Sequence, residues 1–186
     1  WDGVWHHAVF TYNYTTGAFK MYWDGSVDLS QTATTGVNVP TLDHFGARSL
    51  AYGTYYEGNL DEISYFSTEL TSVQVTAFYN SGKPTNLSAE TGLVGYWRMG
   101  EDAIYNGATT EFSLPDNSTN SNSGTSANMD FVDLKTDAPL SPVGYWRMGE
   151  GADWNATEWQ VPDYSRKALF SQQSLEFDGV DDEINL

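Results

Sequence analysis

The first 80 residues alternate short apolar stretches with polar turns, which is the pattern of an antiparallel β protein. The stretch VWHHAVFTYN (4–13) predicts a strand with Trp5 and Val9 on one face and Ala8 and Phe10 on the other. Because both faces are largely apolar, we expect this strand to lie centrally in a β-sandwich.

The following stretch, TTGAFKMYWDGSVDLS (15–30), predicts a β-hairpin. Phe19, Met21 and Trp23 recur on one side of its first strand. Asp24-Gly25 is a strong signal for the turn, because both positions of such a turn take a positive φ. Two further short strands are expected in LDHFGA (42–47) and GNLDEISYF (58–66).

A change of period at LTSVQVTAFYNSG (70–82) predicts one short helix. Thr71 and Gln74 have the spacing of a capping box, and Val75 and Phe78 follow at helical spacing. Gly82 is expected to end the helix region.

The string VGYWRMGE occurs at 94–101 and again, letter for letter, at 143–150. Two copies of a string with Trp, Tyr, Met and Arg do not arise by chance, so we interpret each copy as the first strand of a repeated unit. Alternation places Trp97 and Met99 on one face of that strand, opposite Tyr96 and Arg98.

These elements resemble the laminin-G-like type of the concanavalin A-like lectins and glucanases. In that family a Trp-His-His strand precedes an Asp-Gly hairpin, and a later strand with an Asp-Glu pair leads into a terminal helix. The same order occurs here within 1–82. The family's N-terminal half opens with Gly-Tyr-Trp, passes an Asp-x-Ser turn and reaches a strand similar to LEFDGVDDEINL (175–186). The resemblance implies an all-β fold, an antiparallel jelly-roll β-sandwich with one short helix, plus partial repeat units.

On this basis the chain divides into four segments. Residues 1–82 resemble the C-terminal part of a laminin-G-like sandwich, 83–92 a linker, 93–142 a truncated repeat unit and 143–186 the N-terminal strands of a further unit. Either the chain is cut from a multi-domain array, or its last strands complete the first domain in a permuted or swapped way. The missing central strands of the last unit favour the array, and a chain that begins at Trp1 is expected to be a fragment or a processed piece.

Charge and composition exclude or disfavour several classes of binding partner. The 186 residues include 8 Lys and Arg against 25 Asp and Glu, a formal charge of −17, which disfavours nucleic acid and anionic membranes. No apolar run is long enough for membrane insertion. The absence of cysteine excludes disulfides and Cys-based zinc or redox sites.

The densest carboxylate cluster lies in FDGVDDEINL, where Asp178, Asp181 and Asp182 are candidate Ca²⁺ ligands with Glu183 beside them. The family resemblance adds weight, since several members hold calcium at the edges of the sandwich. The alternative, which we favour, is that Asp178-Gly179 forms a hairpin turn and the other carboxylates are solvated.

Other polar clusters favour structural roles. The loop after Asp116 fails as a calcium loop because Ser121 stands where glycine is required, so an Asx-rich turn is expected. Asp61-Glu62 should point to opposite sides of one strand, with one carboxylate hydrogen-bonded in a structural role. The adjacent His6 and His7 point to opposite faces and do not chelate one metal together.

Catalysis is not expected. The nearest match to the Glu-x-Asp-x-x-Glu stretch of glucanases of this fold class is Glu176, Asp178 and Asp181, but the third carboxylate is an aspartate beyond a glycine turn. The candidate carbohydrate-binding residues are Tyr52, Tyr55 and Tyr56, because sugar rings stack on exposed aromatic faces. Ordinary loop packing is the alternative interpretation of these tyrosines.

The sequence therefore predicts a non-enzymatic structural or adhesive protein with lectin-like modules, displayed on an extracellular or virion surface. Its partners would be a glycan or host-surface ligand and other virion or surface-protein subunits. Similar GYWRMGE repeats are typical of phage and environmental bacterial proteins, which suggests a phage tail fibre or capsid decoration. The alternatives are a calcium-dependent carbohydrate-binding module of a secreted enzyme and, from a third class, a glycosidase.

Overall fold

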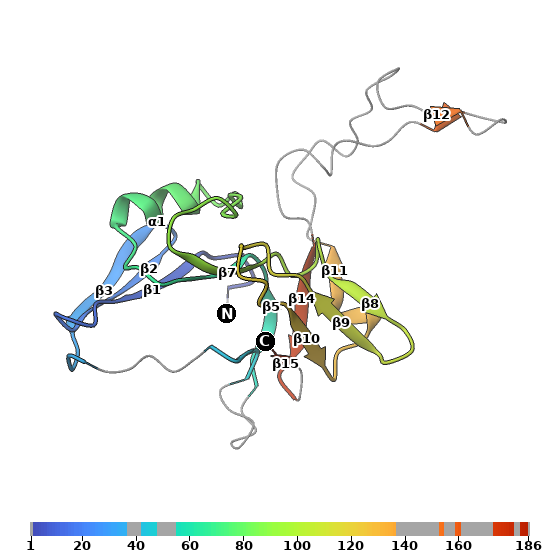
Figure 1. Ribbon diagram of the computed structural model, residues 1–186, viewed down its shortest axis with the longest axis horizontal. Helices are drawn as coiled ribbons and strands as arrows, with labels where there is room; N and C mark the ends of the chain where they lie inside the picture. The colour runs from blue at the N-terminus through green and yellow to red at the C-terminus, as the bar shows by residue number, and fades with distance from the viewer. Residues whose placement is uncertain are drawn as a thin grey trace.

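The computed structural model describes residues 2–36, 42–47, 55–136, 153–154, 159–160, 173–180 and 183–185. These residues form short antiparallel strands and one α-helix, which agrees with the predicted all-β class and a concanavalin A-like β-sandwich. Figure 1 shows two groups of elements side by side, β1–β3 with α1 in one and β8–β11 with β14 and β15 in the other.

The first group contains the predicted hairpin. Its sheet has the order β1-β2-β3, with the bounds Ala8–Tyr12, Ala18–Trp23 and Ser26–Thr32. The turn between β2 and β3 is Asp24-Gly25, whose φ values of 50° and 77° confirm the predicted tight turn. The expected central position of the first strand is wrong for the described strands, because β1 forms the edge of this sheet.

Helix α1 (Ser72–Tyr79) lies against this sheet (Figure 1). The predicted capping box is confirmed: the Thr71 hydroxyl accepts a hydrogen bond from the Gln74 amide, and the Gln74 side chain accepts one from the Thr71 amide. Tyr79 packs so closely on the β2–β3 turn that a Cβ at Gly25 would stand 2.8 Å from its ring.

The second group is built from strands that are far apart in sequence. One sheet has the order β4-β15-β10-β9-β8 and another the order β11-β14-β5, while β6 pairs with β7 and β12 with β13. Their bounds are β4 His44–Phe45, β5 Glu57–Leu60, β6 Ile63–Phe66, β7 Leu93–Trp97, β8 Ile104–Asn106, β9 Glu111–Leu114, β10 Gly124–Ala127, β11 Leu134–Thr136, β12 Asp153–Trp154, β13 Trp159–Gln160, β14 Gln173–Asp178 and β15 Glu183–Asn185. A single 3₁₀ turn, Phe131–Asp133, precedes β11.

Strands from the beginning and the end of the chain share these sheets. β14 pairs with β5 and β15 pairs with β4, so each of the last described strands joins a strand of the first segment, in two different sheets. The sequence analysis left such a pairing open as a permuted or swapped arrangement, beside the favoured array. The boundaries of the four predicted segments stay a prediction.

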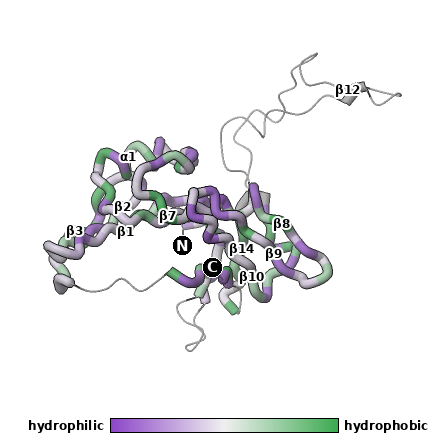
Figure 2. The backbone as a smooth tube through the Cα atoms, in the orientation of Figure 1, coloured by the Kyte–Doolittle hydropathy of each residue, from purple (hydrophilic) through white to green (hydrophobic). Residues whose placement is uncertain are grey.

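Two hydrophobic cores result. The helix core lies between β2, α1 and β7 and contains Tyr22, Leu70, Val75, Phe78, Leu87 and Tyr96. The composite core lies among the second group of strands and contains Phe45, Trp97, Met99, Phe112, Leu114, Met129, Leu175, Phe177 and Ile184. Figure 2 shows hydrophobic residues in both groups, along α1 and along β8–β10. Among the described residues, no helix has the length and apolar character that crossing a membrane requires.

Candidate functional site

Strand β7, which contains the first four residues of the first copy of the repeated string, lies between the two cores. Tyr96 is buried in the helix core, whereas Trp97 and Met99 are buried in the composite core. This confirms the alternation predicted from the sequence. The Trp97 indole N–H donates a hydrogen bond of 2.8 Å to the Asn122 carbonyl, which fixes the ring in its pocket.

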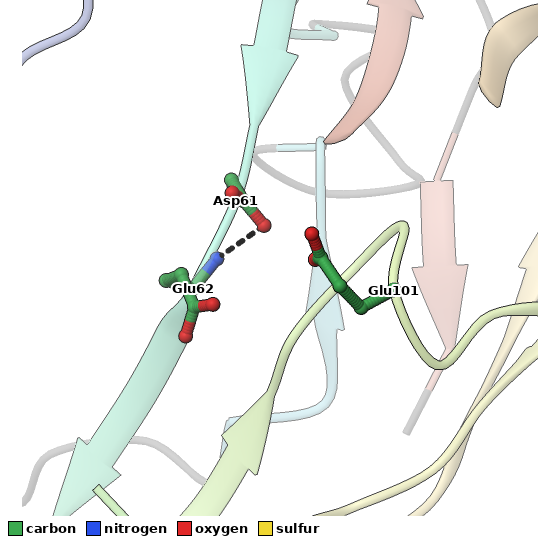
Figure 3. A group of neighbouring side chains, drawn as sticks. All are labelled: Asp61, Glu62 and Glu101. Atoms are coloured by element: carbon green, nitrogen blue, oxygen red, sulfur yellow. Dashed lines mark hydrogen bonds between the residues drawn. The ribbon is translucent and has the colours of Figure 1, made fainter. Parts of the chain in front are cut away.

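The junction beside β7 carries a cluster of carboxylates. β5 ends at Leu60 and β6 begins at Ile63, and Glu62 between them takes a left-handed φ of 51°. The predicted continuous strand is therefore wrong here, and Asp61 and Glu62 do not point to opposite faces. Figure 3 shows both side chains near Glu101, and carboxylate oxygens of the three lie within 4.8 Å of one another.

Glu62 connects this cluster to the chain around β7 through hydrogen bonds. Its carboxylate accepts hydrogen bonds from the Tyr96 hydroxyl and from Arg98 Nε, the latter at 3.2 Å. Burial raises the pKa of Glu62, although Tyr96 and Arg98 oppose this shift. Burial, together with the nearby Glu62 charge, also raises the pKa of the Tyr96 phenol, so this hydroxyl stays protonated and donates.

The opposite side of β7 is held by the predicted Asx-rich turn. Asp116 Oδ1 accepts hydrogen bonds from the amides of Tyr96 and Ser118, at 2.9 and 2.8 Å. The side-chain amides of Asn120 and Asn122 both donate to the Val94 carbonyl. Burial by itself would raise the pKa of Asp116, but hydrogen bonds from the backbone amides of Ser118, Asn122 and Tyr96 hold it below its ordinary value. The turn therefore serves as a hydrogen-bonded brace for β7.

The carboxylate cluster has the chemistry of a cation site. Three carboxylates and the one guanidinium of Arg98 leave an excess of negative charge, and oxygen ligands suit Ca²⁺. Glu62 already accepts hydrogen bonds from Tyr96 and Arg98, so a cation here would also have to be held by Asp61 and Glu101. The residues fit a partial coordination sphere that backbone oxygens or water would have to complete.

A second feature is the outer face of the β1–β3 sheet, which we call the aromatic face. Paired residues across the strands share this face, namely Phe10, Tyr12, Phe19, Met21, Trp23 and Leu29. The opposite face carries Val9 and Tyr22 into the helix core. Phe10 is 64% exposed and Trp23 is 42% exposed, so large apolar groups meet solvent here.

One edge of the aromatic face is polar. The His6 ring lies 4.6 Å from the Trp23 ring, and its two nitrogens bond Asp24 Oδ2 at 2.8 Å and Asp2 Oδ2 at 2.9 Å. Hydrogen bonds with Asp2 and Asp24 raise the pKa of His6, and two carboxylate partners favour the doubly protonated ring. His7, on the other side, stacks on Tyr79, and burial lowers its pKa.

The predicted carbohydrate-binding tyrosines do not form a described aromatic surface. Tyr52 lies outside the described residues. Tyr55 is half-buried and forms a single bridge with Ala47. Tyr56 packs against the composite core, with its ring 6.2 Å from Phe177 in an edge-on arrangement, and burial raises its pKa. Sugar binding at these tyrosines stays a prediction.

Most of the predicted metal ligands also lie outside the residues that the structure describes. Asp181 and Asp182 lie outside the described residues, and Asp178 is described by its backbone alone, paired with Glu57 in β14. The Asp178-Gly179 turn leads from β14 in one sheet to β15 in another rather than closing a hairpin. Calcium binding by these aspartates stays a prediction.

Two features of these sites were missed by the sequence analysis. Glu101 was not considered a ligand, although it is the last residue of the repeated string and thus lies close to β7. The exposure of Phe10 and Trp23 was not predicted, because an apolar pattern does not reveal which sheet face remains uncovered. The alternation grouped each residue with its correct neighbours on one face of its strand, but it did not predict that this face is exposed.

Comparison with known proteins agrees with the β-sandwich. Residues 2–76 match the family model described as the concanavalin A-like lectin/glucanases superfamily, which confirms the resemblance over this part of the chain. The matched segment runs from β1 into α1. No curated protein and no solved structure matches the chain.

Proposed function

Residues 2–76 match the lectin/glucanase superfamily, and we propose that the chain is a non-enzymatic, lectin-like recognition module that binds a glycan on the aromatic face. The observation that carries this proposal is the exposure of Phe10 and Trp23 on one sheet face, beside the two carboxylates that are hydrogen-bonded to His6. Carbohydrate sites combine aromatic rings for the apolar side of a sugar with a few polar groups for its hydroxyls.

The polar edge suits hydroxyl groups. Asp2 and Asp24 are acceptors, and the His6 ring, hydrogen-bonded to both, holds their carboxylates in place beside Trp23. The acidic surroundings, part of a chain with a formal charge of −17, favour a neutral or amino sugar over an anionic one.

A non-enzymatic role is supported by the environment of Glu176, the residue nearest to the glucanase motif. Its carboxylate is 2.6 Å from the Lys135 ammonium across the β11–β14 pair, and both side chains are partly exposed. A carboxylate held in a surface ion pair is suited to sheet register rather than to acid–base chemistry.

We further propose that the module is displayed on an extracellular or virion surface, as an adhesive or decorating subunit. The features that support this are the repeated string, the absence of cysteine and the strong acidity. Other subunits of the same surface would then be its protein partners.

The experiment is a glycan-array screen of the protein and three variants, followed by titration calorimetry on any sugar bound. Trp23→Ala and Phe10→Ala should each weaken binding about fivefold, since loss of a stacking ring removes about 1 kcal/mol. Phe131→Ala is the matched control, because Phe131 is exposed to a similar extent in the other group of strands. Binding that persists in Trp23→Ala, or the absence of binding by the folded protein, would contradict the proposal.

A second candidate function is favoured by the carboxylate cluster: Ca²⁺ held by Asp61, Glu62 and Glu101 would make recognition calcium-dependent. Calorimetric titration with Ca²⁺ should then show binding that Glu101→Gln weakens at least tenfold. Glu90→Gln, outside the cluster, is the control. Equal Ca²⁺ affinity in the wild type and Glu101→Gln would show that the calcium site does not include Glu101 and would contradict this proposal.

A further inference from the structure

The turn that joins β8 to β9 begins with an asparagine followed by a glycine, Asn106-Gly107. Both residues are exposed. Asn106 is the last residue of β8 and pairs with Glu111 of β9. The next pair along the hairpin, Tyr105 with Phe112, packs in the composite core. A chemical change at Asn106 therefore acts on a strand pair that belongs to this core.

The conformation of the turn does not require a glycine at position 107. Gly107 does not take a positive φ, and the turn instead places one, of 57°, at Thr110. A Cβ at Gly107 would stand 3.9 Å from the Tyr105 ring, which is an ordinary van der Waals contact. What the glycine provides is access, because the absence of a side chain leaves its amide nitrogen open to the Asn106 side chain.

The Asn106 side chain is held by one hydrogen bond. Its Oδ1 accepts this bond, of 3.0 Å, from the Ala108 amide. The bond polarises the side-chain carbonyl and stabilises negative charge that develops on Oδ1, as the donors of an oxyanion hole do. The Nδ2 group donates to no other described residue, so it is free to leave as ammonia.

The amide of Gly107 is a nucleophile next to this carbonyl. It donates to no described group, whereas the amides of Thr109 and Thr110 both donate to the Asn106 main-chain carbonyl. Attack of the Gly107 nitrogen on Asn106 Cγ closes a five-membered ring within the chain. Such a reaction needs no encounter between two molecules, which lowers its entropic cost.

We propose that Asn106-Gly107 is a self-modifying site, where the chain cyclises to a succinimide that water opens to aspartate or isoaspartate. The Gly107 nitrogen gives its proton to a solvent base and bonds to Asn106 Cγ. The bond from Cγ to Nδ2 breaks, and the amino group takes a proton from water and leaves as ammonia. Water then adds to either ring carbonyl and breaks its bond to the nitrogen, which gives aspartate or isoaspartate.

Asn86 makes the same side-chain contact but has a different neighbour. Its Oδ1 accepts a hydrogen bond of 3.0 Å from the Ser88 amide, as Asn106 Oδ1 does from Ala108. The next residue, however, is Leu87, whose side chain is buried in the helix core. We expect this anchored, bulky residue to hinder ring closure, so Asn86 is the internal control for the glycine.

Asn117 precedes a small residue, but both of its reacting groups are engaged. Its Nδ2 donates to Asp102 Oδ2 at 3.1 Å, and the amide of Ser118 donates to Asp116 Oδ1 at 2.8 Å. The leaving group and the attacking nitrogen are therefore both held by carboxylates. Asn117 is the internal control for the hydrogen bonds.

The modification weakens the β8–β9 hairpin. Because Asn106 pairs with Glu111, the new carboxylate lies opposite an existing one, and like charges at such positions destabilise a strand pair. Isoaspartate in addition inserts a methylene into the main chain, which disturbs the register of the pair. Hydrogen exchange in β8 and β9 should therefore accelerate in the modified protein.

Peptide mass mapping of the folded full chain during incubation at pH 8 tests the proposal. Loss of ammonia and later addition of water should appear at Asn106, at least about ten times faster than at Asn86 or Asn117. Hydroxylamine, which attacks the succinimide ring, should cleave the chain after residue 106. Conversion should slow at pH 6, because the Gly107 nitrogen attacks only after it loses its proton.

Gly107→Val should slow conversion at least about tenfold, because its branched side chain hinders the attack. Gly107→Ala is the second variant, since a Cβ fits at this position, and its rate should lie between the two. Circular dichroism verifies that each variant is folded. An unchanged rate in Gly107→Val, equal rates at Asn106 and Asn117, or conversion only in protein unfolded by denaturant would each overturn the proposal.

Discussion

The helix core and the composite core differ in how much of the chain each one needs. The helix core is built from residues between Tyr22 and Tyr96, and much of it comes from α1 and the segments beside it. The composite core takes residues from Phe45 to Ile184 and closes only when β14 and β15 pair with β5 and β4. One core is thus largely local in sequence, and the other depends on long-range strand pairing.

The difference shows what the family match over 2–76 does and does not explain. That segment supplies Tyr22, Leu70 and Val75 to the helix core, but only Phe45 to the described buried residues of the composite core. The composite core therefore depends on the repeat and on the C-terminal strands. β7 connects the two, because its alternate side chains enter different cores.

The largest expected effect on stability comes from removing a buried ring from the composite core. Phe177→Ala removes a fully buried ring and should lower the free energy of unfolding by about 3–5 kcal/mol. Hydrogen exchange should accelerate in β9, β10 and β14 and stay nearly unchanged in β1 and β2. Phe78→Ala in the helix core is the matched variant and should show the reverse distribution. Equal acceleration in both groups would show that the cores unfold as one unit.

The next effect concerns Glu62, which lies where the cores meet. Glu62→Gln should cost about 1–2 kcal/mol at neutral pH, because an amide has one acceptor oxygen where the carboxylate has two, so either Tyr96 or Arg98 loses its acceptor. The pH dependence distinguishes this residue from others. Since burial raises the pKa of Glu62 in the folded protein, the wild type binds more protons when folded and gains stability as the pH falls through that pKa towards 4.5.

Denaturant unfolding of the wild type and Glu62→Gln between pH 7 and pH 4.5 measures this contribution as a difference. On acidification, the free energy of unfolding of the wild type should rise relative to that of Glu62→Gln. Asp116 contributes in the opposite sense, because its folded pKa is lowered and its stabilisation is lost as the pH falls below 3.8. A wild type that loses stability relative to Glu62→Gln would show that the Arg98 ion pair outweighs burial.

Local signals in the sequence predicted the local structure. The Asp24-Gly25 turn, the Thr71–Gln74 capping box and the two faces of β7 each follow from a few neighbouring residues, and each is confirmed. The pairing of β14 with β5 could not be chosen from the sequence, because alternation defines the faces of a strand but not its neighbour.

The candidate site shows the same limit. The sequence identified Asp61 and Glu62 but assumed one continuous strand, whereas a positive φ at Glu62 interrupts it. Glutamate rarely adopts this conformation without a tertiary cause. The hydrogen bonds from Tyr96 and Arg98 are such a cause, and these residues lie 34 and 36 positions away in the sequence. The carboxylate cluster with Glu101 was therefore not visible in the local pattern.

The smallest effect tests whether the helix core responds to a purely local change. Thr71→Ala removes the side-chain acceptor of the Gln74 amide and should lower the free energy of unfolding by about 1 kcal/mol. Ser72→Ala, one residue further on and outside the capping box, is the control and should change stability little. Because α1 contributes Val75 and Phe78 to the helix core, exchange should accelerate in α1 and β2 but not in β14. Acceleration in β14 would mean that β7 transmits even a local loss in the helix core to the composite core.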